Sequence, residues 1–500
     1  MEWKALIDGE WTDAASKEKS TLKDPSTGEV LGTVPKCGVD DARRAIDAAR
    51  EAFDKGVWSS TKPKERAKVL HKAAALLSER QGDLSLLETR NAGKPIRQST
   101  YFDLALAVHH LEYFGGLAAH LTPKRIRQPD MEGSYGTILR EPMGVVAGIC
   151  PWNLPLLMAV WKAGPALAAG NAVILKPAST TPLTTLELGR ALLDAGLPKN
   201  ALQVITGPGE AIGTLLSSDP KIDKVSFTGS TEVGKEVLLK AAPTVKRTTM
   251  ELGGKSANIL LEDADLDRAI DGSLFGIFLH AGQLCESGSR LLVPRATQDD
   301  VLRRLVARAR EMRLGITTSY DTDIGPLISG SHRDRVEEYI RSGREQGAHV
   351  ETGGKRPDHP ELKHGFYEEP TIFSGVTPDM KIAQEEIFGP VLVVIPFDDD
   401  ADAVRIANDS RYGLCGSVWT ADAARGLAVA RGVRTGTYMV NSSIPVDYTA
   451  PFGGFKESGI GREFGTEGME LFCEVKSVIF GPGISSTEIG APPVVQTSAG

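Results

Sequence analysis

Apolar side chains recur every three or four positions from about residue 40 onward, which predicts amphipathic helices. Asp40 can cap the first helix, whose apolar face carries Ala42, Ala45, Ile46, Ala49 and Phe53. A second helix is predicted from about Pro63 into Leu87, before the helix-breaking segment 91–95, and a third from Phe102 to Leu117. The residues before Asp40 are rich in turn-forming residues and predict short strands and loops.

The pattern changes after Met143, where short apolar runs alternate with helical segments. Buried strands are predicted at 145–150, 172–175 and 224–228, and helices at 161–169, 183–194 and 232–241. This alternation is typical of a parallel sheet with crossover helices. Ligands of such sheets collect beyond the carboxyl ends of the strands, so the residues that follow each strand are candidates for binding.

A second alternating set follows Gly254 and predicts a second α/β domain. It comprises a strand at 256–261, helices at 265–279 and 297–312, and a strand at 391–396. The segment after Gly481 is rich in Ser, Thr and Pro and is expected to be mobile. A chain of 500 residues is too long for one core, which also favours two or three domains.

Composition narrows the class of protein. Apolar residues make up 41% of the chain and charged residues 24%, as in soluble globular proteins. A net charge of −8 gives no electrostatic reason to bind nucleic acid or an anionic membrane. We also expect no membrane span and, without a signal peptide, a cytoplasmic location. The five cysteines are an odd number without metal-ligand spacing, so we expect a reducing compartment and no metal site.

Cys285 and Glu251 are the first candidates for catalysis. Cys285 lies among small residues, and Glu251 begins the run Glu-Leu-Gly-Gly-Lys, whose glycines permit close backbone approach. If the fold brings them together, a thiolate nucleophile and a carboxylate base make a covalent catalyst. Taken singly, a cysteine such as Cys285 is more often a buried structural residue than a catalytic one, and Glu251 could equally be a loop residue before a strand.

Polar residues that follow the predicted strands suggest binding of a substrate and an anion. Asn153, between two prolines, could donate to a developing oxyanion, or could be a polar turn residue. Lys176 could bind ribose hydroxyls or phosphate, although such a lysine is usually only solvated. The segment 227–234 suits a pyrophosphate at a helix N-terminus but lacks the G-x-G-x-x-G pattern.

Taken in order, these segments resemble the aldehyde dehydrogenase superfamily from Ile7 to about Lys476, together with Glu-Glu-Ile-Phe-Gly-Pro at 385–390. The resemblance implies an α/β fold with a Rossmann-like cofactor domain at 1–122 and 144–253 and an α/β catalytic domain at 254–455. It also implies a small β oligomerisation element at 123–143 and 471–488, made of a hairpin near Pro123–Glu141 and a strand after Leu471. Residues 456–470 would return to the cofactor domain, and 489–500 would be a mobile tail.

The same resemblance implies a role for particular residues. Cys285 matches the nucleophile, Glu251 the general base and Asn153 the oxyanion donor, with Lys162 and Glu463 in a supporting charge relay. The matching cofactor residues are Ile149, Trp152, Lys176, Ser179, Gly209, Gly229, Ser230, Gly234, Leu252, Glu386 and Phe388. The matching substrate-tunnel residues are Leu154, Leu157, Trp161 and Phe452.

The implied reaction is oxidation of an aldehyde to a carboxylic acid with NAD, through a thiohemiacetal and a thioester on Cys285 that water hydrolyses. Many NAD-preferring relatives carry glutamate where this chain has Ser179, and serine does not repel a 2′-phosphate, so NADP is also possible. The sequence shows neither an arginine cluster for an anionic semialdehyde nor an aromatic cage for a quaternary ammonium. We therefore expect a medium-sized neutral aldehyde and a tunnel mouth that includes Asp447 and Tyr448. The resemblance to the family also implies a homodimer or homotetramer.

Three other classes of protein remain. A coenzyme A-acylating relative would pass the acyl group to a thiol, whereas Glu251 favours water. A cysteine-dependent esterase would not need Lys176, Gly229 or Glu386. A catalytically silent relative would be expected to have lost Cys285 or Glu251.

Overall fold

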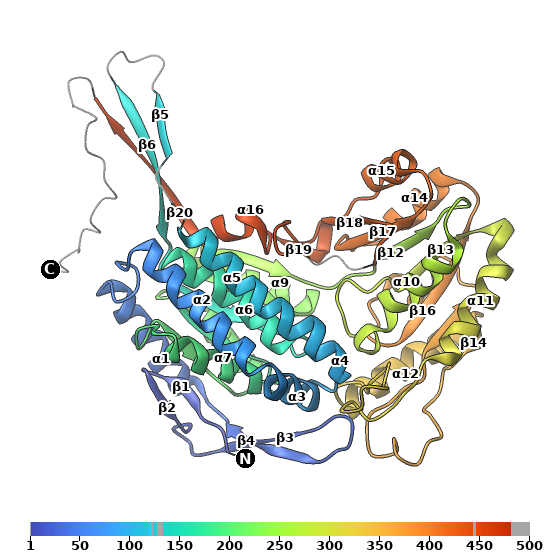
Figure 1. Cartoon of the computed structure of the whole chain (residues 1–500), viewed down its shortest axis with the longest axis horizontal. Helices are drawn as coiled ribbons and strands as arrows, with labels where there is room; N and C mark the ends of the chain where they lie inside the picture. Colours follow the sequence, from blue (N-terminus) through green and yellow to red (C-terminus); the bar gives the residue numbers. More distant parts are fainter. Residues whose placement is uncertain (1, 120, 122–123, 128–133, 444–446, 482–500) are drawn as a thin grey trace.

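The computed structural model describes residues 2–119, 121, 124–127, 134–443 and 447–481. The predicted mobile tail, 489–500, lies outside these residues, as do 123, 128–133 and 482–488 of the predicted oligomerisation element. Two large sheets, each with its own helices, stand side by side, and a narrow three-stranded arm projects from the first (Figure 1).

The first large sheet has eight strands, and those from β11 through β9 run parallel. Its spatial order is β19 (Gly459–Ile460), β11 (Arg247–Glu251), β10 (Lys224–Thr228), β7 (Val145–Ile149), β8 (Ala172–Lys176), β9 (Leu202–Val204), β1 (Ala5–Ile7) and β2 (Glu10–Thr12). The strands predicted at 145–150, 172–175 and 224–228 are thereby confirmed and are neighbours in the sheet.

Helices cover both faces of this sheet because neighbouring residues of a strand point to opposite sides. Val146 packs with α2 (Pro63–Glu79), α5 (Ala105–Ala119), α6 (Pro155–Ala169) and α7 (Leu183–Asp194). Val145 and Ala147 pack with α1 (Val39–Asp54), α8 (Gly209–Ser218) and α9 (Thr231–Ala241). Further segments at its edge are α3 (Gln81–Ala92), α4 (Ile96–Gln98), the π-turn Ser99–Leu104 and α16 (Gly465–Glu470).

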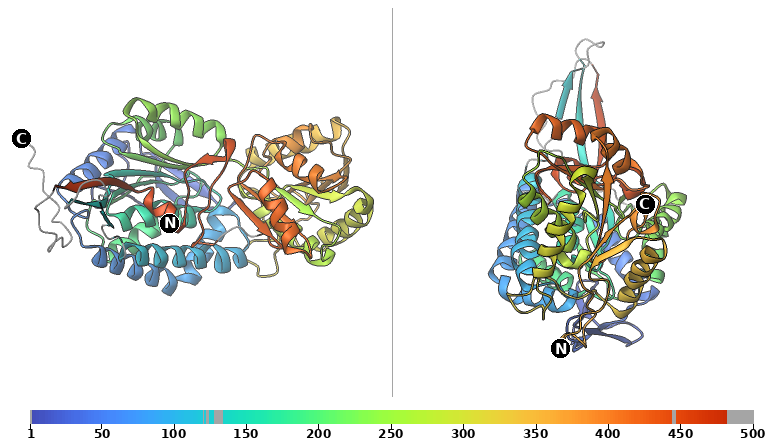
Figure 2. Two further views of the ribbon diagram at one scale, coloured as in Figure 1. Left: turned by 90° about the horizontal axis from the view of Figure 1, so that it is seen from above. Right: turned by 90° about the vertical axis from the view of Figure 1, so that its right-hand side faces the viewer.

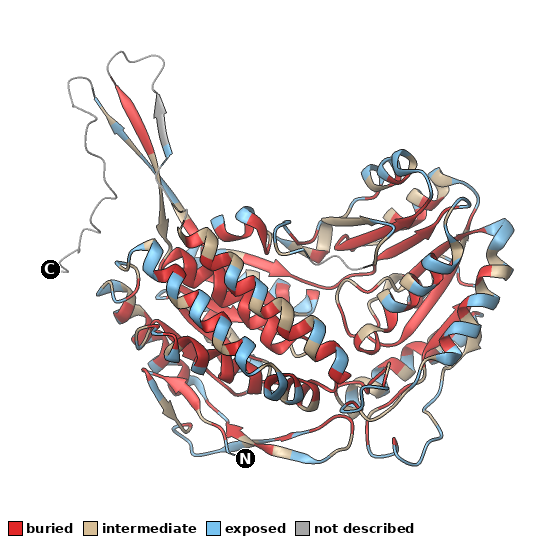
Figure 3. Cartoon of the chain, viewed as in Figure 1, coloured by how far each residue is buried: buried red, intermediate tan, exposed pale blue. Residues whose placement is uncertain are grey.

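The second sheet has seven strands, which run parallel except for the pair β14–β15. Its order is β14 (His349–Thr352), β15 (Thr371–Ser374), β16 (Val391–Phe397), β13 (Arg290–Pro294), β12 (Ala257–Leu260), β17 (Cys415–Trp419) and β18 (Thr437–Val440). Its helices are α10 (Leu266–Phe278), α11 (Gln298–Glu311), α12 (Gly330–Glu345), α13 (Lys381–Gln384), α14 (Asp400–Asn408) and α15 (Ala423–Gly432). The inner strands of both sheets and helix α6 are buried almost throughout, whereas the edge strands β2, β14, β18 and β19 are largely intermediate or exposed and most other helices have a buried and an exposed face (Figure 3).

Two small sheets complete the described residues. The arm pairs β20 (Cys473–Phe480) with β6 (Tyr135–Pro142), which pairs with β5 (Lys124–Arg127). The arm stands clear of the body in two perpendicular views (Figures 1 and 2). The other small sheet pairs β3 (Lys19–Lys23) with β4 (Val30–Pro35) and confirms short strands near the start of the chain.

Two predicted helices have the wrong bounds. The helix expected from Pro63 to Leu87 is two helices, because the chain turns at Arg80, where φ is −103° and ψ is 19°. Its predicted stop is right, since Gly93 ends α3 in a left-handed conformation (φ 75°). The helix expected at 161–169 begins six residues earlier at Pro155, in the first helical position, where proline needs no N–H partner.

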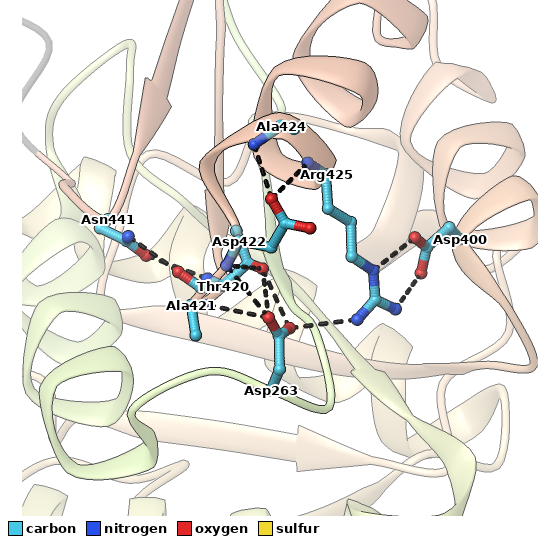
Figure 4. Close-up of polar contacts among 8 residues, drawn as sticks. All are labelled: Asp263, Asp400, Thr420, Ala421, Asp422, Ala424, Arg425 and Asn441. Atoms are coloured by element: carbon cyan, nitrogen blue, oxygen red, sulfur yellow. Dashed lines mark hydrogen bonds and ion pairs between the residues drawn. The ribbon is translucent and has the colours of Figure 1, made fainter.

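A polar cluster joins the loops beyond the carboxyl ends of β12, β16 and β17 (Figure 4). Asp263 accepts hydrogen bonds from the Thr420 hydroxyl at 2.9 and 2.7 Å and from the Ala421 backbone at 2.9 Å, and pairs with Arg425 at 3.1 Å. Arg425 also forms two hydrogen bonds to Asp400, at 2.7 and 2.6 Å. The cluster therefore fixes one end of the second sheet.

No helix among the described residues combines the length and the apolar character needed to cross a membrane.

Candidate active site

Cys285 follows a strained turn between α10 and β13. His280, Ala281 and Gly282 are consecutive left-handed residues with φ of 50°, 53° and 73°. This conformation is unfavourable for residues with a side chain, and such strain clusters at functional sites. All five cysteines are free, and Cys285 is half-buried whereas the others are buried. The turn thus presents the one cysteine that a ligand can reach.

The Cys285 thiol contacts a carboxylate. Its Sγ donates a hydrogen bond to Oε2 of Glu286 at 3.2 Å. Burial, followed by the negative charge of Glu286, raises the pKa of Cys285 well above its usual range. The thiol is therefore protonated at neutral pH in this structure.

Two glycines of the Glu-Leu-Gly-Gly-Lys run let other parts of the site approach its backbone. A Cβ on Gly254 would lie 2.1 Å from the Cys285 carbonyl oxygen, and one on Gly253 would lie 2.6 Å from Oε2 of Glu386. The Gly254 N–H also donates to Oε1 of Glu386 at 3.0 Å. This run therefore joins the nucleophile loop to a predicted cofactor residue.

Glu251 ends β11 and is buried. Neither carboxylate oxygen has a hydrogen-bond partner among the described residues, and a Cβ on Gly453 would lie 2.9 Å from Oε1. Burial, followed by the charge of Glu463, raises the pKa of Glu251 well above its usual range, while Lys162 and Arg462 oppose this. A carboxyl group with a raised pKa and free oxygens is suited to proton transfer.

Asn153 reaches the nucleophile loop from the carboxyl end of β7. Its Nδ2 donates to the backbone oxygen of Gln283 at 2.9 Å, two residues before Cys285. The amide has two N–H groups, so one remains for an oxyanion. Gln283 is itself fixed, because its side chain donates to His280 O at 2.9 Å and accepts from Ile328 N at 2.9 Å.

Lys162 and Glu463 form a buried ion pair beside the candidate base. Ser226 donates to the same Glu463 carboxylate at 3.5 Å. The Glu463 backbone pairs with that of Phe452 through hydrogen bonds of 2.7 and 2.8 Å. The predicted relay residues are thus in contact with each other, and Glu463 is tied to a predicted tunnel residue.

The predicted cofactor residues gather at the carboxyl ends of neighbouring strands. Ile149 ends β7, and Lys176 ends β8, where burial lowers its pKa to about 8. The Lys176 ammonium donates only to Pro177 O, at 2.8 Å, among described residues, so it has donors to spare. Ser179 is exposed in the loop that follows, and Gly209 is the exposed first residue of α8.

The N-terminus of α9 lies at the end of the adjacent strand β10. Gly229 donates to Glu251 O at 3.0 Å, and Ser230 caps the helix by accepting from Val233 N at 3.4 Å. Gly234 and Leu252 are buried against each other. Thr228, the last residue of β10, is buried with a hydroxyl that has no partner among the described residues. The carboxyl ends of these strands therefore offer unused donors to an anionic dinucleotide, which fits the cofactor that the sequence implies.

Glu386 and Phe388 come from the second sheet, in the segment that precedes β16. Burial raises the pKa of Glu386 to about 7, against the Gly254 N–H and Lys255. The Phe388 ring packs edge-on against Trp152, with centroids 5.2 Å apart, and His332 Nε2–H donates to Phe388 O at 2.7 Å. Trp152, which follows β7, thus links the two sheets.

The predicted substrate-tunnel residues belong to an aromatic cluster. Trp161 lies 4.3 Å from Phe464 and 5.9 Å from Phe452, measured between ring centroids, and Leu154 and Leu157 are buried nearby on α6 and its N-cap. His110, Tyr113 and Tyr448 extend the cluster outward, with His110 and Tyr113 lying 5.8 and 5.5 Å from Tyr448. Tyr113 and Tyr448 are half-buried and Asp447 is exposed.

Nearly the whole chain matches one protein family. The model of the aldehyde dehydrogenase family matches residues 11–478. This chain belongs to that family. Betaine aldehyde dehydrogenase from Bacillus subtilis (strain 168) is 45% identical over 473 residues, covering 95% of this chain and 96% of that protein.

Solved structures agree with this family assignment. A betaine aldehyde dehydrogenase from Staphylococcus aureus in complex with NAD+ is 39% identical, with a TM-score of 0.94, over 98% of this chain and 97% of that one. A point mutant of that enzyme, with NAD+ and a BME-modified cysteine, is 38% identical with the same TM-score, over 98% of this chain and 99% of that one. The predicted α/β aldehyde dehydrogenase fold is confirmed.

Several residues of this aldehyde dehydrogenase site were not predicted from the sequence. Glu286 adjoins Cys285, and that adjacency was the available signal. Gln283 and Phe464 similarly neighbour predicted residues, whereas His110 joins the cluster only through the packing of α5 on α6. No group of three or more His, Cys, Asp or Glu is placed to hold a metal ion among the described residues.

Proposed function

We propose that this aldehyde dehydrogenase oxidises an aldehyde to a carboxylic acid with NAD, through a thiohemiacetal and then a thioester on Cys285. The observation that carries the proposal is the strained turn that presents Cys285 directly against Gly254, in the run that also supplies Glu251. The bond between sulfur and carbon divides the oxidation into two easier steps.

The cofactor would lie across the carboxyl ends of β7, β8 and β10. Lys176 would donate to ribose hydroxyls, the α9 N-terminus would face the pyrophosphate, and Glu386 would hold the second ribose. When bound, NAD supplies the acceptor for the hydride that leaves the substrate carbon. Exposed Ser179 offers neither a repelling carboxylate nor a cation to a 2′-phosphate, so use of NADP is also proposed.

Cys285 would attack the aldehyde carbon, and the free N–H of Asn153 with the Cys285 backbone N–H would stabilise the oxyanion. Glu251 would then take a proton from the water that hydrolyses the thioester. Its free, buried oxygens favour this role. The Lys162–Glu463 pair would adjust the pKa of Glu251, since the Glu463 carboxylate raises this pKa and the Lys162 cation lowers it.

The substrate is proposed to be a medium-sized neutral aldehyde whose body packs on Trp161, Phe452 and Phe464. A second candidate is betaine aldehyde or a similar small quaternary ammonium aldehyde. The structure favours this candidate in one respect that the sequence did not reveal: Tyr448 and Tyr113 add aromatic faces near exposed Asp447. Aromatic faces and a carboxylate attract a cation.

A homodimer or homotetramer is proposed, held together by the projecting arm. Val475 and Ile479 of β20 are 61% and 58% exposed, and an apolar strand that protrudes in this way can pair with another chain. Light scattering tests this proposal, and a monomer would contradict it.

The function is tested by initial rates of nicotinamide reduction with NAD and NADP across neutral, cationic and anionic aldehydes. Cys285→Ala should abolish the activity, and a Ser179→Glu variant should keep the NAD rate while losing the NADP rate. Best activity with an anionic semialdehyde would refute both substrate proposals. Ester hydrolysis without nicotinamide reduction would show instead that the protein acts as a cysteine-dependent esterase.

A further inference from the structure

Glu286 stands where it can receive a proton from the nucleophile. It follows Cys285 directly, and the Ser287 N–H donates to Leu284 O at 3.3 Å, so the chain turns tightly around these two residues. Its Oε2 accepts a hydrogen bond from the Cys285 Sγ–H at 3.2 Å.

Attack on an aldehyde requires the thiol to lose its proton. Neither carboxylate oxygen of Glu251 makes a hydrogen bond among the described residues, so this carboxylate does not accept the thiol proton here. Asn153 offers amide N–H groups to this region, and these donate protons rather than accept them. Glu386 also lies near the thiol, but its carboxylate accepts from the Gly254 N–H, whereas Glu286 accepts the hydrogen bond of the thiol itself.

We propose that Glu286 is the catalytic base that deprotonates Cys285 as the aldehyde is attacked. The S–H bond breaks and its proton forms an O–H bond on Glu286, while the sulfur electron pair forms the bond to the carbonyl carbon. The carbonyl π pair moves onto the oxygen. Because Glu286 is half-buried, its proton can then pass to solvent water.

The same carboxylate keeps the resting thiol neutral. Its negative charge contributes to the raised pKa of Cys285, because a thiolate beside a carboxylate is repelled. Burial also raises the pKa of Glu286, which makes it a stronger proton acceptor. During attack the negative charge moves to the carbonyl oxygen, so the proton transfer and the new bond occur together.

Removing the negative charge of Glu286 should change two measured rates in opposite directions: alkylation of Cys285 should become faster and the burst of nicotinamide reduction slower. In Glu286→Gln the resting thiolate is no longer repelled, so the thiol of the cofactor-free protein reacts more readily with iodoacetamide. We expect the pH of half-maximal alkylation to fall by about one unit; the charges of Glu386 and Cys415, which also face the thiol, are unchanged. The pre-steady-state burst of nicotinamide reduction should meanwhile slow by about 10²-fold.

The experiment compares wild type, Glu286→Gln, Glu286→Asp and the exposed control Glu345→Gln, with Cys285→Ala as the blank for alkylation. The control should match wild type in both measurements. Glu286→Asp keeps a carboxylate, and should restore part of the burst rate and of the higher alkylation pH. It also keeps the proposal testable if the glutamine variant does not fold.

The inference rests on the proposed role of Cys285, and the variants separate the two. A burst that survives in Cys285→Ala would refute the proposed function. If Cys285→Ala is inactive but Glu286→Gln retains the wild-type burst, only the role of Glu286 is refuted. Alkylation and burst that slow together in Glu286→Gln would likewise refute it and indicate a structural role.

Discussion

Replacing Gly254 with alanine should misplace the nucleophile. The new Cβ would lie 2.1 Å from the Cys285 carbonyl oxygen, whereas a carbon ordinarily keeps about 3.3 Å from such an oxygen. The loop that carries Cys285 must therefore move by roughly 1 Å, a displacement that can cost about 10²-fold in rate.

The assay is kcat/KM for aldehyde oxidation, combined with urea unfolding. We expect Gly254→Ala to lower kcat/KM by about 10²-fold and the stability by about 1–3 kcal/mol, since the added methyl group overpacks the site. Gly288→Ala is the matched control in the same loop, because its Cβ would meet only Asn258, at an ordinary 3.5 Å.

A Gly254→Ala variant with the wild-type kcat/KM would refute the reasoning, since it would show that the contact between this glycine and Cys285 does not position the thiol. An equal loss in Gly288→Ala would also refute it, because that substitution creates no clash.

Three further predictions follow from charged residues. Glu251→Gln should keep the burst of nicotinamide reduction but slow steady-state turnover by about 10²-fold, and should lose the rise in wild-type rate as pH increases through the raised Glu251 pKa; a lost burst would contradict its role in deacylation. Lys162→Met should destabilise the fold by about 3–5 kcal/mol in urea, because it leaves the Glu463 carboxylate buried without its cation; an unchanged midpoint would contradict this. Asp263→Asn should lower the urea midpoint at pH 7. Burial raises the pKa of Asp263, but hydrogen bonds from Thr420 and Ala421 outweigh burial and hold this pKa below its usual value. The stability that the Asp263 carboxylate contributes is therefore present above about pH 4 and is lost as the pH falls through the lowered pKa. A deficit of the Asn variant that does not begin to shrink as the pH falls below about 4 would refute that linkage.

Strands and helices were predicted well where apolar runs or periodic apolar positions within the segment itself determine them. The apolar runs at 145–150 and 172–175 became neighbouring strands, because a buried strand must be apolar on both faces. The break at Arg80 was missed, because both helices carry good helix-forming residues and the turn depends on what each helix packs against. Pro155 was a usable start signal that the prediction did not apply.

The expectation that ligands bind beyond the carboxyl ends of parallel strands describes only the part of the candidate site that the first sheet supplies. Asn153 and Lys176 do follow strands of the first sheet. Cys285 and Glu386, however, precede β13 and β16, at the amino ends of second-sheet strands. Because the rule concerns one sheet, it could not show that two sheets would face each other across the site.

By itself the sequence determined the family and the buried strands, and it predicted a nucleophile and an accompanying base, because these depend on residue type, order and local periodicity. Only the tertiary structure decided which groups touch. The contact of Gly254 with Cys285, the burial of Lys162 against Glu463, and the aromatic cluster around Trp161 join segments from 31 to 303 positions apart. Contacts at such separations arise from packing of whole sheets and helices, and no local pattern of side chains encodes them.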